Sequence, residues 1–275
     1  VSTQSTGQLM NPFLQDPVTH PSISWQDAFT SDVQPFRLRP LPTDEDTIAI
    51  LGMNGVIQQY SFQTSKMLPL VATGGQPTDL TVIDGKQTIV TDVSWNNLMA
   101  VREAQVQGLM DQDAGIHFPL AVVNLNGYVY FSDQSGLYSF SSDGLLQKLS
   151  EQTGITALSV AHQCIMMAVN GENTIKCLRP GFEPVNYCTG LFGAFRLVDM
   201  QTGPNNSILV VTESVNRGDE NGHFGYLFII SQCGIPSACI NLPGVPQSVC
   251  YIDGKILLAI AESKVVYQIP ITVFG

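Results

Sequence analysis

A short pattern of strand, turn and strand recurs along the chain, and this repeat constrains the fold more than any other feature. It is plainest in residues 79–86, 120–127 and 249–255, where an apolar run meets Asp-Gly or Asn-Gly. These dipeptides supply the positive φ angles of a tight hairpin turn. Gly85 and Gly127 lie 42 residues apart, and Gly254 follows about three such periods later. Strand repeats of roughly 40 residues predict a β-propeller.

Six such units can be laid over the chain. They begin near Phe36, Thr78, Pro119, Ile155, Phe195 and Gln247. The sequence therefore predicts an all-β propeller with six blades, and a seven-bladed ring that lacks one blade is the alternative. A β-sandwich would not explain the near-equal periods. One stretch, residues 97–110, also carries a weak helical periodicity.

The last unit is short of a strand. It holds three strand candidates, residues 248–252, 256–261 and 265–271, whereas a closed ring needs a partner for its last sheet edge. The amphipathic segment 22–29 lies just before the first unit and can supply that partner. We therefore expect residues 34–275 to form a single propeller domain. Residues 1–33 are interpreted as a tail or linker that carries a closing strand near 22–29.

Composition limits the partners. The formal net charge is −11, which disfavours direct binding of nucleic acid and favours a basic or hydrophobic protein or peptide partner. No apolar run reaches the length that spans a bilayer, so we expect no membrane insertion. The start of the chain has no leader-like pattern, and we expect a cytoplasmic or nuclear protein.

All six cysteines lie in the second half of the chain, several within apolar runs. This placement favours reduced thiols in the core, with one or more disulfides as the alternative. Their spacing does not match a zinc site, and we predict neither a metal nor a cofactor.

The period and strand pattern resemble those of a divergent WD-repeat-type β-propeller over roughly Phe36 to Gly275. The resemblance implies a scaffold that docks a peptide or domain of a partner within a larger complex, usually without catalysis. It names no specific member of the family.

Two regions are candidates for partner binding. The stretch 213–224 interrupts the even repeat between two strong strands, and a hairpin needs only a few residues there. Its candidate residues are Glu213, Arg217, Asp219, Glu220 and His223. A tolerated surface insertion is the alternative.

Aromatic residues of the third unit form the second candidate region. Tyr128, Tyr130 and Tyr138 are of the type that dominates protein interfaces. Ordinary packing between blades is the alternative interpretation.

No local motif announces catalysis. The chain lacks a Gly-x-Ser-x-Gly elbow, a phosphate loop and a His-Glu-x-x-His site. Several polar residues fall where first strands begin or end, near the expected central channel: Asp79, Asp84, Asn124, Asn126, His162, Asp199 and Asp253. We interpret Asp84 and Asp253 as turn residues and predict no catalytic residue and no enzymatic activity. The alternatives are a six-bladed hydrolase or lactonase-like enzyme and a secreted adhesion or receptor propeller.

Overall fold

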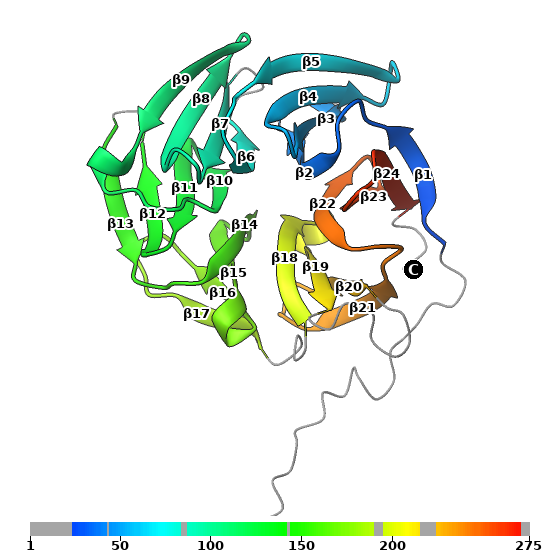
Figure 1. Ribbon diagram of the computed structural model, residues 1–275. Helices are drawn as coiled ribbons and strands as arrows, with labels where there is room; N and C mark the ends of the chain where they lie inside the picture. Colours follow the sequence, from blue (N-terminus) through cyan, green and yellow to red (C-terminus); the bar gives the residue numbers. More distant parts are fainter. Residues whose placement is uncertain are drawn as a thin grey trace, which may run out of the picture.

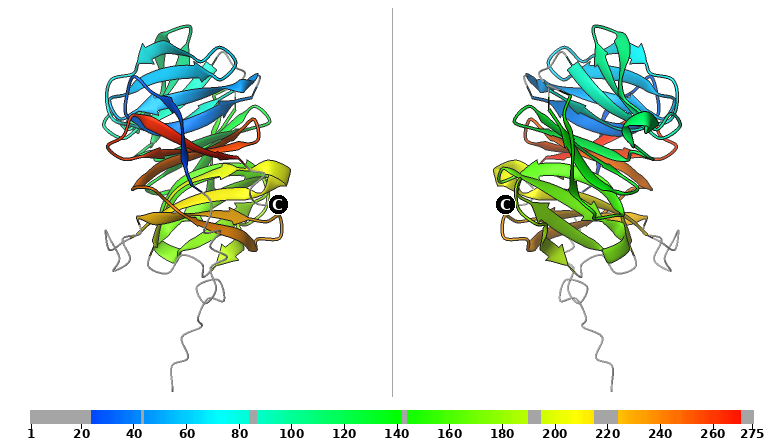
Figure 2. Two further views of the ribbon diagram at one scale, coloured as in Figure 1. Left: turned by 90° about the vertical axis from the view of Figure 1, so that its right-hand side faces the viewer. Right: turned by 90° about the vertical axis from the view of Figure 1, so that its left-hand side faces the viewer.

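The chain folds into a ring of six four-stranded antiparallel sheets, each a propeller blade (Figure 1). The computed structural model describes residues 24–42, 44–83, 87–141, 144–189, 195–214 and 224–270. In every blade the first strand lies nearest the axis, and the side views show the blades edge-on around the ring (Figures 1 and 2). The predicted six-bladed β-propeller is confirmed.

The first three blades follow the chain order. Blade 1 consists of β2 (Pro35–Leu41), β3 (Asp44–Gly52), β4 (Val56–Ser61) and β5 (Lys66–Ala72). Blade 2 consists of β6 (Pro77–Val82), β7 (Gln87–Asp92), β8 (Asn97–Arg102) and β9 (Gln105–Met110), and the short 3-10 helix η1 (Gln112–Ala114) follows. Blade 3 consists of β10 (Ala121–Leu125), β11 (Tyr128–Asp133), β12 (Gly136–Phe140) and β13 (Leu146–Ser150).

The other three blades repeat this arrangement. Blade 4 consists of β14 (Ile155–Ala161), β15 (Cys164–Val169), β16 (Thr174–Leu178) and β17 (Val185–Thr189), with the 3-10 turn η2 (Asn170–Glu172) after β15. Blade 5 consists of β18 (Phe195–Thr202), β19 (Ile208–Ser214), β20 (Gly225–Ile230) and β21 (Pro236–Asn241), with η3 (Pro204–Asn206) after β18. Blade 6 consists of β22 (Pro246–Ile252), β23 (Lys255–Ile260), β24 (Val265–Pro270) and β1 (Gln26–Thr30).

Blade 6 is completed by the N-terminal strand β1, as the sequence predicts. β1 runs antiparallel to β24, with Gln26 opposite Gln268 and Thr30 opposite Val265. The ring of Phe29 stacks on Tyr60 of blade 1 at 3.9 Å between centroids. The closing strand therefore satisfies the edge of β24 and also joins blade 6 to blade 1.

The hairpin turns at the inner strands have the geometry that their dipeptides require. Asn126 and Gly127 have φ angles of 54° and 83°, and Asp253 and Gly254 have 46° and 67°. Positive φ at both central residues gives a turn whose twist matches the flanking strands. The Asp84-Gly85 turn lies outside the described residues.

The weak helical periodicity of residues 97–110 does not produce a helix. β8 and β9 occupy this stretch, joined by a turn in which Glu103 and Ala104 have φ angles of 48° and 62°. Leu98 and Met99 are both buried because β8 has a neighbouring blade on each face. A strand buried on both faces does not show the two-residue alternation that separates strand from helix.

The core lies between blades. Blades 4 and 5, for example, pack Ala157 and Met166 against Ile208 and Phe228. All six cysteines are free. Only Cys188 and Cys250 are buried in the core, as expected; Cys233 is exposed, and the other three are half-buried. Among the described residues, none of the helices has the length and apolar character needed to cross a bilayer.

Removing β1 should destabilise the ring. Four residue pairs join β1 to β24. At about 1 kcal/mol net per hydrogen bond, deleting residues 1–33 should lower the free energy of unfolding by roughly 3 kcal/mol and expose a sheet edge. Chemical denaturation and size-exclusion chromatography would measure both effects, with deletion of residues 1–23 as the control. Equal stability and monomeric elution of the two truncated proteins would contradict the closing role of β1.

The buried thiols should resist modification until high pH. Burial raises the pKa of Cys188, Cys239 and Cys250 to about 12, from an ordinary value of 9.0. Because the folded pKa is the higher one, their stabilising effect is complete below pH 9.0 and is lost as pH rises toward 12. A thiol reagent at about pH 8 should modify the exposed Cys233 rapidly in the folded protein. Modification of all six thiols should require denaturation. Rapid reaction of Cys250 in the folded protein would contradict this prediction.

Candidate functional site

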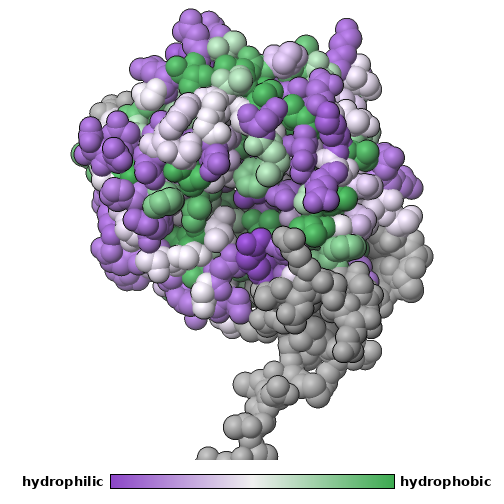
Figure 3. Space-filling model, viewed as in Figure 1, coloured by the Kyte–Doolittle hydropathy of each residue, from purple (hydrophilic) through white to green (hydrophobic). Residues whose placement is uncertain are grey.

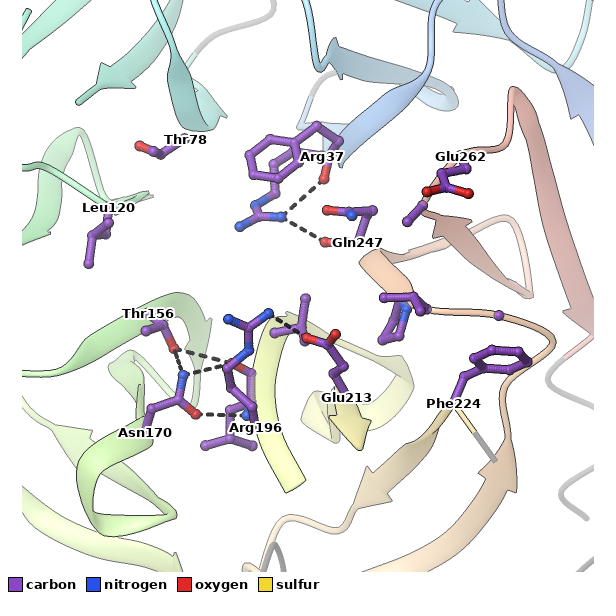
Figure 4. A pocket seen from close by; sticks show the side chains of 17 residues that line it. Arg37, Thr78, Leu120, Thr156, Asn170, Arg196, Glu213, Phe224, Gln247 and Glu262 are labelled. Carbon is purple, nitrogen blue, oxygen red and sulfur yellow. Dashed lines mark hydrogen bonds and ion pairs between the residues drawn. The ribbon is translucent and has the colours of Figure 1, made fainter. Parts of the chain in front are cut away.

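One end of the ring axis opens into a cavity of about 770 Å³. Residues from all six blades line this central cavity, chiefly where the innermost strands begin and where the second strands end (Figure 4). Because each blade contributes from the same end, residues far apart in sequence face one space. The cavity is therefore the candidate functional site.

β-Bulges aim several side chains into the central cavity. In five blades the pairing of the first two strands shifts near the start of the innermost strand. The residues at these shifts are Phe36, Thr78, Thr156, Val198 and Gln247, and all five line the cavity. A bulge adds one residue and redirects its side chain, and bulges recur beside active sites.

Blade 5 supplies a charged pair to the wall. Arg196 and Glu213 lie directly opposite on β18 and β19, and the Arg196 guanidinium donates to the Glu213 carboxylate (Figure 4). The Arg196 side chain is 62% exposed, whereas that of Glu213 is only 10% exposed. The pair therefore places a fixed carboxylate inside the cavity and a guanidinium toward its opening.

Asn170 joins blade 4 to the strand that carries Arg196. Its Oδ1 accepts from the Leu197 amide at 2.7 Å, and its Nδ2 donates to the Leu197 carbonyl at 2.9 Å. The same Nδ2 donates to Thr156 Oγ1 at 2.9 Å. These bonds hold the start of β18 in a fixed position, and with it the backbone of Arg196.

Arg37 lies at the bottom of the central cavity, on the first strand of blade 1. Its Nη1 donates to the Phe36 carbonyl at 3.0 Å and to the Gln247 carbonyl at 2.7 Å (Figure 4). Its guanidinium also stacks over the Phe36 ring, 4.1 Å from the centroid. Burial lowers the pKa of Arg37, and the charges of Asp199 and Asp79 act in the opposite direction.

Beneath the central cavity, Arg39 forms a buried ion cluster with two carboxylates. Arg39 Nη2 donates to Asp79 Oδ1 at 2.6 Å and to Asp199 Oδ1 at 3.0 Å, and its Nη1 donates to Asp199 Oδ2 at 2.9 Å. Burial opposes the charged form of each group. For Arg39 and Asp199 the mutual attraction outweighs burial, so the pKa of Arg39 is raised and that of Asp199 lowered. For Asp79 burial outweighs the attraction of Arg39 and Arg37, and its pKa is raised.

The carboxylates of this ion cluster also connect neighbouring blades. Asp79 Oδ2 accepts from the Val122 amide of blade 3 at 3.1 Å, and Asp199 Oδ2 accepts from the Val249 amide of blade 6 at 3.1 Å. Ser248 of blade 6 adds a further connection between blades. Its Oγ donates to Asp199 of blade 5 and accepts from the Leu38 amide of blade 1. Asp79 and Asp199 are thus fully engaged below the cavity.

Apolar side chains complete the lining. Leu120, Val198, Val245, Pro246 and Phe224 contribute to the wall. Figure 3 shows apolar and polar residues mixed around the hollowed centre of the ring. The cavity therefore suits a small organic molecule that has both an apolar body and polar groups.

Of the residues predicted for partner binding, the four that the structure describes do not gather at one site. Glu213 lines the central cavity, whereas Arg217, Asp219, Glu220 and His223 lie outside the described residues. Tyr130 is 5% exposed and packs between blades 3 and 4. Tyr138 stacks on Phe131, and only Tyr128, 52% exposed, presents a broad surface.

Most polar residues expected near the channel have structural positions. Asp79 and Asp199 meet Arg39, as described above. Asn126, His162 and Asp253 occupy hairpin turns between first and second strands, away from the cavity end of the ring. Asn124 lies within β10, and Asp84 lies outside the described residues.

Sequence reasoning did not select Arg37, Arg196, Thr156 and Asn170. A local signal was present in several blades, because Pro35, Pro77, Pro119 and Pro246 each stand immediately before a residue that lines the cavity. Proline lacks an amide proton and favours strand starts and bulges. The blade period combined with these prolines would have located the ring of lining residues.

No protein-family model matches the sequence, and no curated protein matches it. Solved structures do. A suspected gluconolactonase has a TM-score of 0.65 and 12% identity, with 95% of this chain and 96% of that chain covered. Virginiamycin B lyase from Staphylococcus aureus has a TM-score of 0.64 and 11% identity, with 89% and 98% covered. The calcium-binding protein regucalcin from Agrobacterium tumefaciens has a TM-score of 0.65 and 9% identity, with 88% and 90% covered.

These comparisons correct the functional expectation. The sequence predicted a non-enzymatic interaction scaffold of the WD-repeat type, but similar structures that span the whole ring bear the names of enzymes. The scaffold prediction is wrong on this finding, and so is the prediction that the chain is not an enzyme. The period of a propeller repeat reports blade size, which binding and catalytic propellers share, so it could not separate the two.

The described residues do not fit a calcium ion at the axis. Calcium takes six to eight oxygen ligands, several of them carboxylates. The axial carboxylates here are bonded to Arg39 and to backbone amides. Among the described residues, no three His, Cys, Asp or Glu side chains come together as a metal-ligand set.

Replacing Arg39 should destabilise the fold strongly. Arg39→Met leaves Asp79 and Asp199 buried with only the more distant Arg37 as a counter-charge, and breaking a buried pair in this way costs about 3–5 kcal/mol. Arg102→Met is the matched control, because Arg102 is exposed and its side chain donates a hydrogen bond to Gln87. Urea denaturation should show the large loss for Arg39→Met only. Equal stability of both variants would show that the ion cluster is not required for the fold.

Proposed function

We propose that the chain is an enzyme that hydrolyses a small ester or lactone in the central cavity. One observation carries this proposal: a nearly buried carboxylate, Glu213, is held by Arg196 at a cavity built from bulged residues. The similarity in fold to a suspected gluconolactonase supports the reaction class. The described residues that line the cavity include no Ser or Cys side chain, so we propose direct attack by water and not by a serine or cysteine nucleophile.

Glu213 would act as the general base. Its carboxylate accepts a proton from a water molecule, and the resulting hydroxide attacks the substrate carbonyl carbon. The bond from that carbon to the leaving oxygen then breaks, and the proton returns from Glu213 to the leaving oxygen. The net change is addition of one water, which gives a carboxylic acid and an alcohol.

Arg196 would fix the base and stabilise developing charge. Its bond to Glu213 restricts the carboxylate to one orientation, which reduces the reorganisation needed for proton transfer. The exposed guanidinium would also stabilise the negative charge that grows on the attacked carbonyl oxygen. Asn170 would act as a positioning residue, since it holds the start of the Arg196 strand.

Glu213→Gln should abolish most hydrolysis while the fold remains intact. Loss of a general base typically lowers the rate by 10²–10⁴-fold, so kcat should fall by about 100-fold or more. A panel of small lactones and aryl esters, followed by pH-stat and absorbance, would measure the rate, and thermal denaturation would check folding.

Glu172→Gln is the matched control for this experiment. Glu172 is an exposed glutamate on blade 4 that pairs with Lys176, outside the central cavity. The control should keep the wild-type rate. An equal rate for Glu213→Gln, or no turnover of any substrate by the wild type, would reject the proposed function.

A further inference from the structure

Arg37 is a buried cation without a close carboxylate of its own. Among the described residues it makes one ion pair, at 3.9 Å from Nε to Asp79 Oδ1. That oxygen is already engaged by Arg39 Nη2 at 2.6 Å and by the Leu80 amide at 2.8 Å. The short contacts of Arg37 are instead neutral carbonyls. Arg37 is only 8% exposed, so water compensates little of its charge.

The surroundings leave the charge of Arg37 directed toward the central cavity. The Phe36 ring covers one face of the guanidinium, and the Gln247 carbonyl holds one edge. Figure 4 shows the other edge of the guanidinium on the open side of the site, facing the space between Thr78, Leu120 and Arg196. A cation stripped of water gains most from an oxyanion that reaches this free edge.

The two arginines of the central cavity differ in this respect. Arg196 is exposed and its charge is matched by Glu213, whereas Arg37 lies deeper and has no such partner at hydrogen-bond distance. An anionic group would therefore bind at Arg37, while the scissile bond lies beside Glu213. Because Glu213 and Glu262 also line the cavity, a monoanion is favoured over a dianion.

We propose that the substrate carries a carboxylate that pairs with Arg37 at the bottom of the central cavity. This inference rests on the proposed function and names the substrate class: monoesters of small dicarboxylic acids, hydroxy acids acylated at the hydroxyl, or lactones of hydroxy-dicarboxylic acids. Each of these keeps one free carboxylate. Apolar wall residues such as Leu120 and Val198 contact the chain between the two ends.

Direct binding tests this proposal without turnover. Calorimetric titration with hexanoate and with hexanamide compares two probes of equal shape that differ in charge. Wild-type protein should bind hexanoate at least ten-fold more tightly, and the preference should shrink as salt is raised because the charges become screened. Inorganic phosphate, titrated in parallel, should bind more weakly than hexanoate.

Variants assign the preference to Arg37. Arg37→Gln should remove it, and Arg37→Lys should keep part of it, because lysine retains the charge but not the planar fork. Arg102→Gln is the exposed control and should match the wild type. If Arg37→Gln fails to fold, Arg37→Lys decides whether Arg37 causes the preference for hexanoate over hexanamide. A reduced preference in Arg37→Lys supports that assignment, and an unchanged preference contradicts it.

The outcomes separate this inference from the proposed function. Anion preference lost in Arg37→Gln supports the inference even if no ester is hydrolysed. Ester hydrolysis with equal affinity for hexanoate and hexanamide overturns the inference and leaves the proposed function standing. Absence of saturable hexanoate binding, stronger binding of phosphate, or a preference unchanged in the Arg37 variants also overturns it.

Discussion

The buried guanidinium of Arg39 is the interaction on which the centre of the ring depends. It bonds to carboxylates from blades 2 and 5, so one side chain of blade 1 fixes the positions of two other blades. Each carboxylate passes the connection on to a backbone amide of the next blade. A buried ion pair adds little net stability compared with apolar packing, but a misplaced register would leave a charge unpaired. We therefore regard the ion cluster as a device that specifies how the blades meet.

The central cavity is a consequence of that arrangement. Arg37 and Arg39 lie two residues apart on β2, so both point to the same side of the strand, one toward the cavity and one below it. Because Asp79 and Asp199 both bond directly to Arg39, Arg37 has no carboxylate at hydrogen-bond distance, although the two arginines and two carboxylates balance in formal charge. The same residues that hold the ring together thus leave one guanidinium at the bottom of the cavity without a directly bonded carboxylate.

Much of the fold could be predicted from local chemistry. The Asn126-Gly127 and Asp253-Gly254 turns are recognisable because few other dipeptides adopt two positive φ angles. The closing strand followed from a blade with three strands and a spare segment upstream. Residues 97–110 were ambiguous because β8 is buried on both faces, and tertiary context decided its structure.

The site was harder to predict for a physical reason. Arg37, Thr156, Arg196 and Glu213 are separated by long stretches of chain and meet only because each lies at the same end of its blade. Glu213 was predicted as a binding residue because the stretch 213–224 interrupts the repeat. Its pairing with Arg196 on β18 played no part in that prediction. Asp79 and Asp199 looked like channel residues, but pairing with Arg39 was invisible without the ring.

The negative net charge of the chain limits where a small anion can bind, and this bears on the position of Arg37. With 23 acidic residues against 12 basic ones, the protein surface repels small anions on average. A substrate with a carboxylate would be drawn into the ring only where a cation locally outweighs this field. Lysines outside the cavity that pair with glutamates, such as Lys148 and Lys176, offer no such place. Arg37 does, because it is only 8% exposed and among the described residues has no carboxylate at hydrogen-bond distance. The acidic exterior and the cationic cavity bottom together favour a monoanion at this one end of the axis.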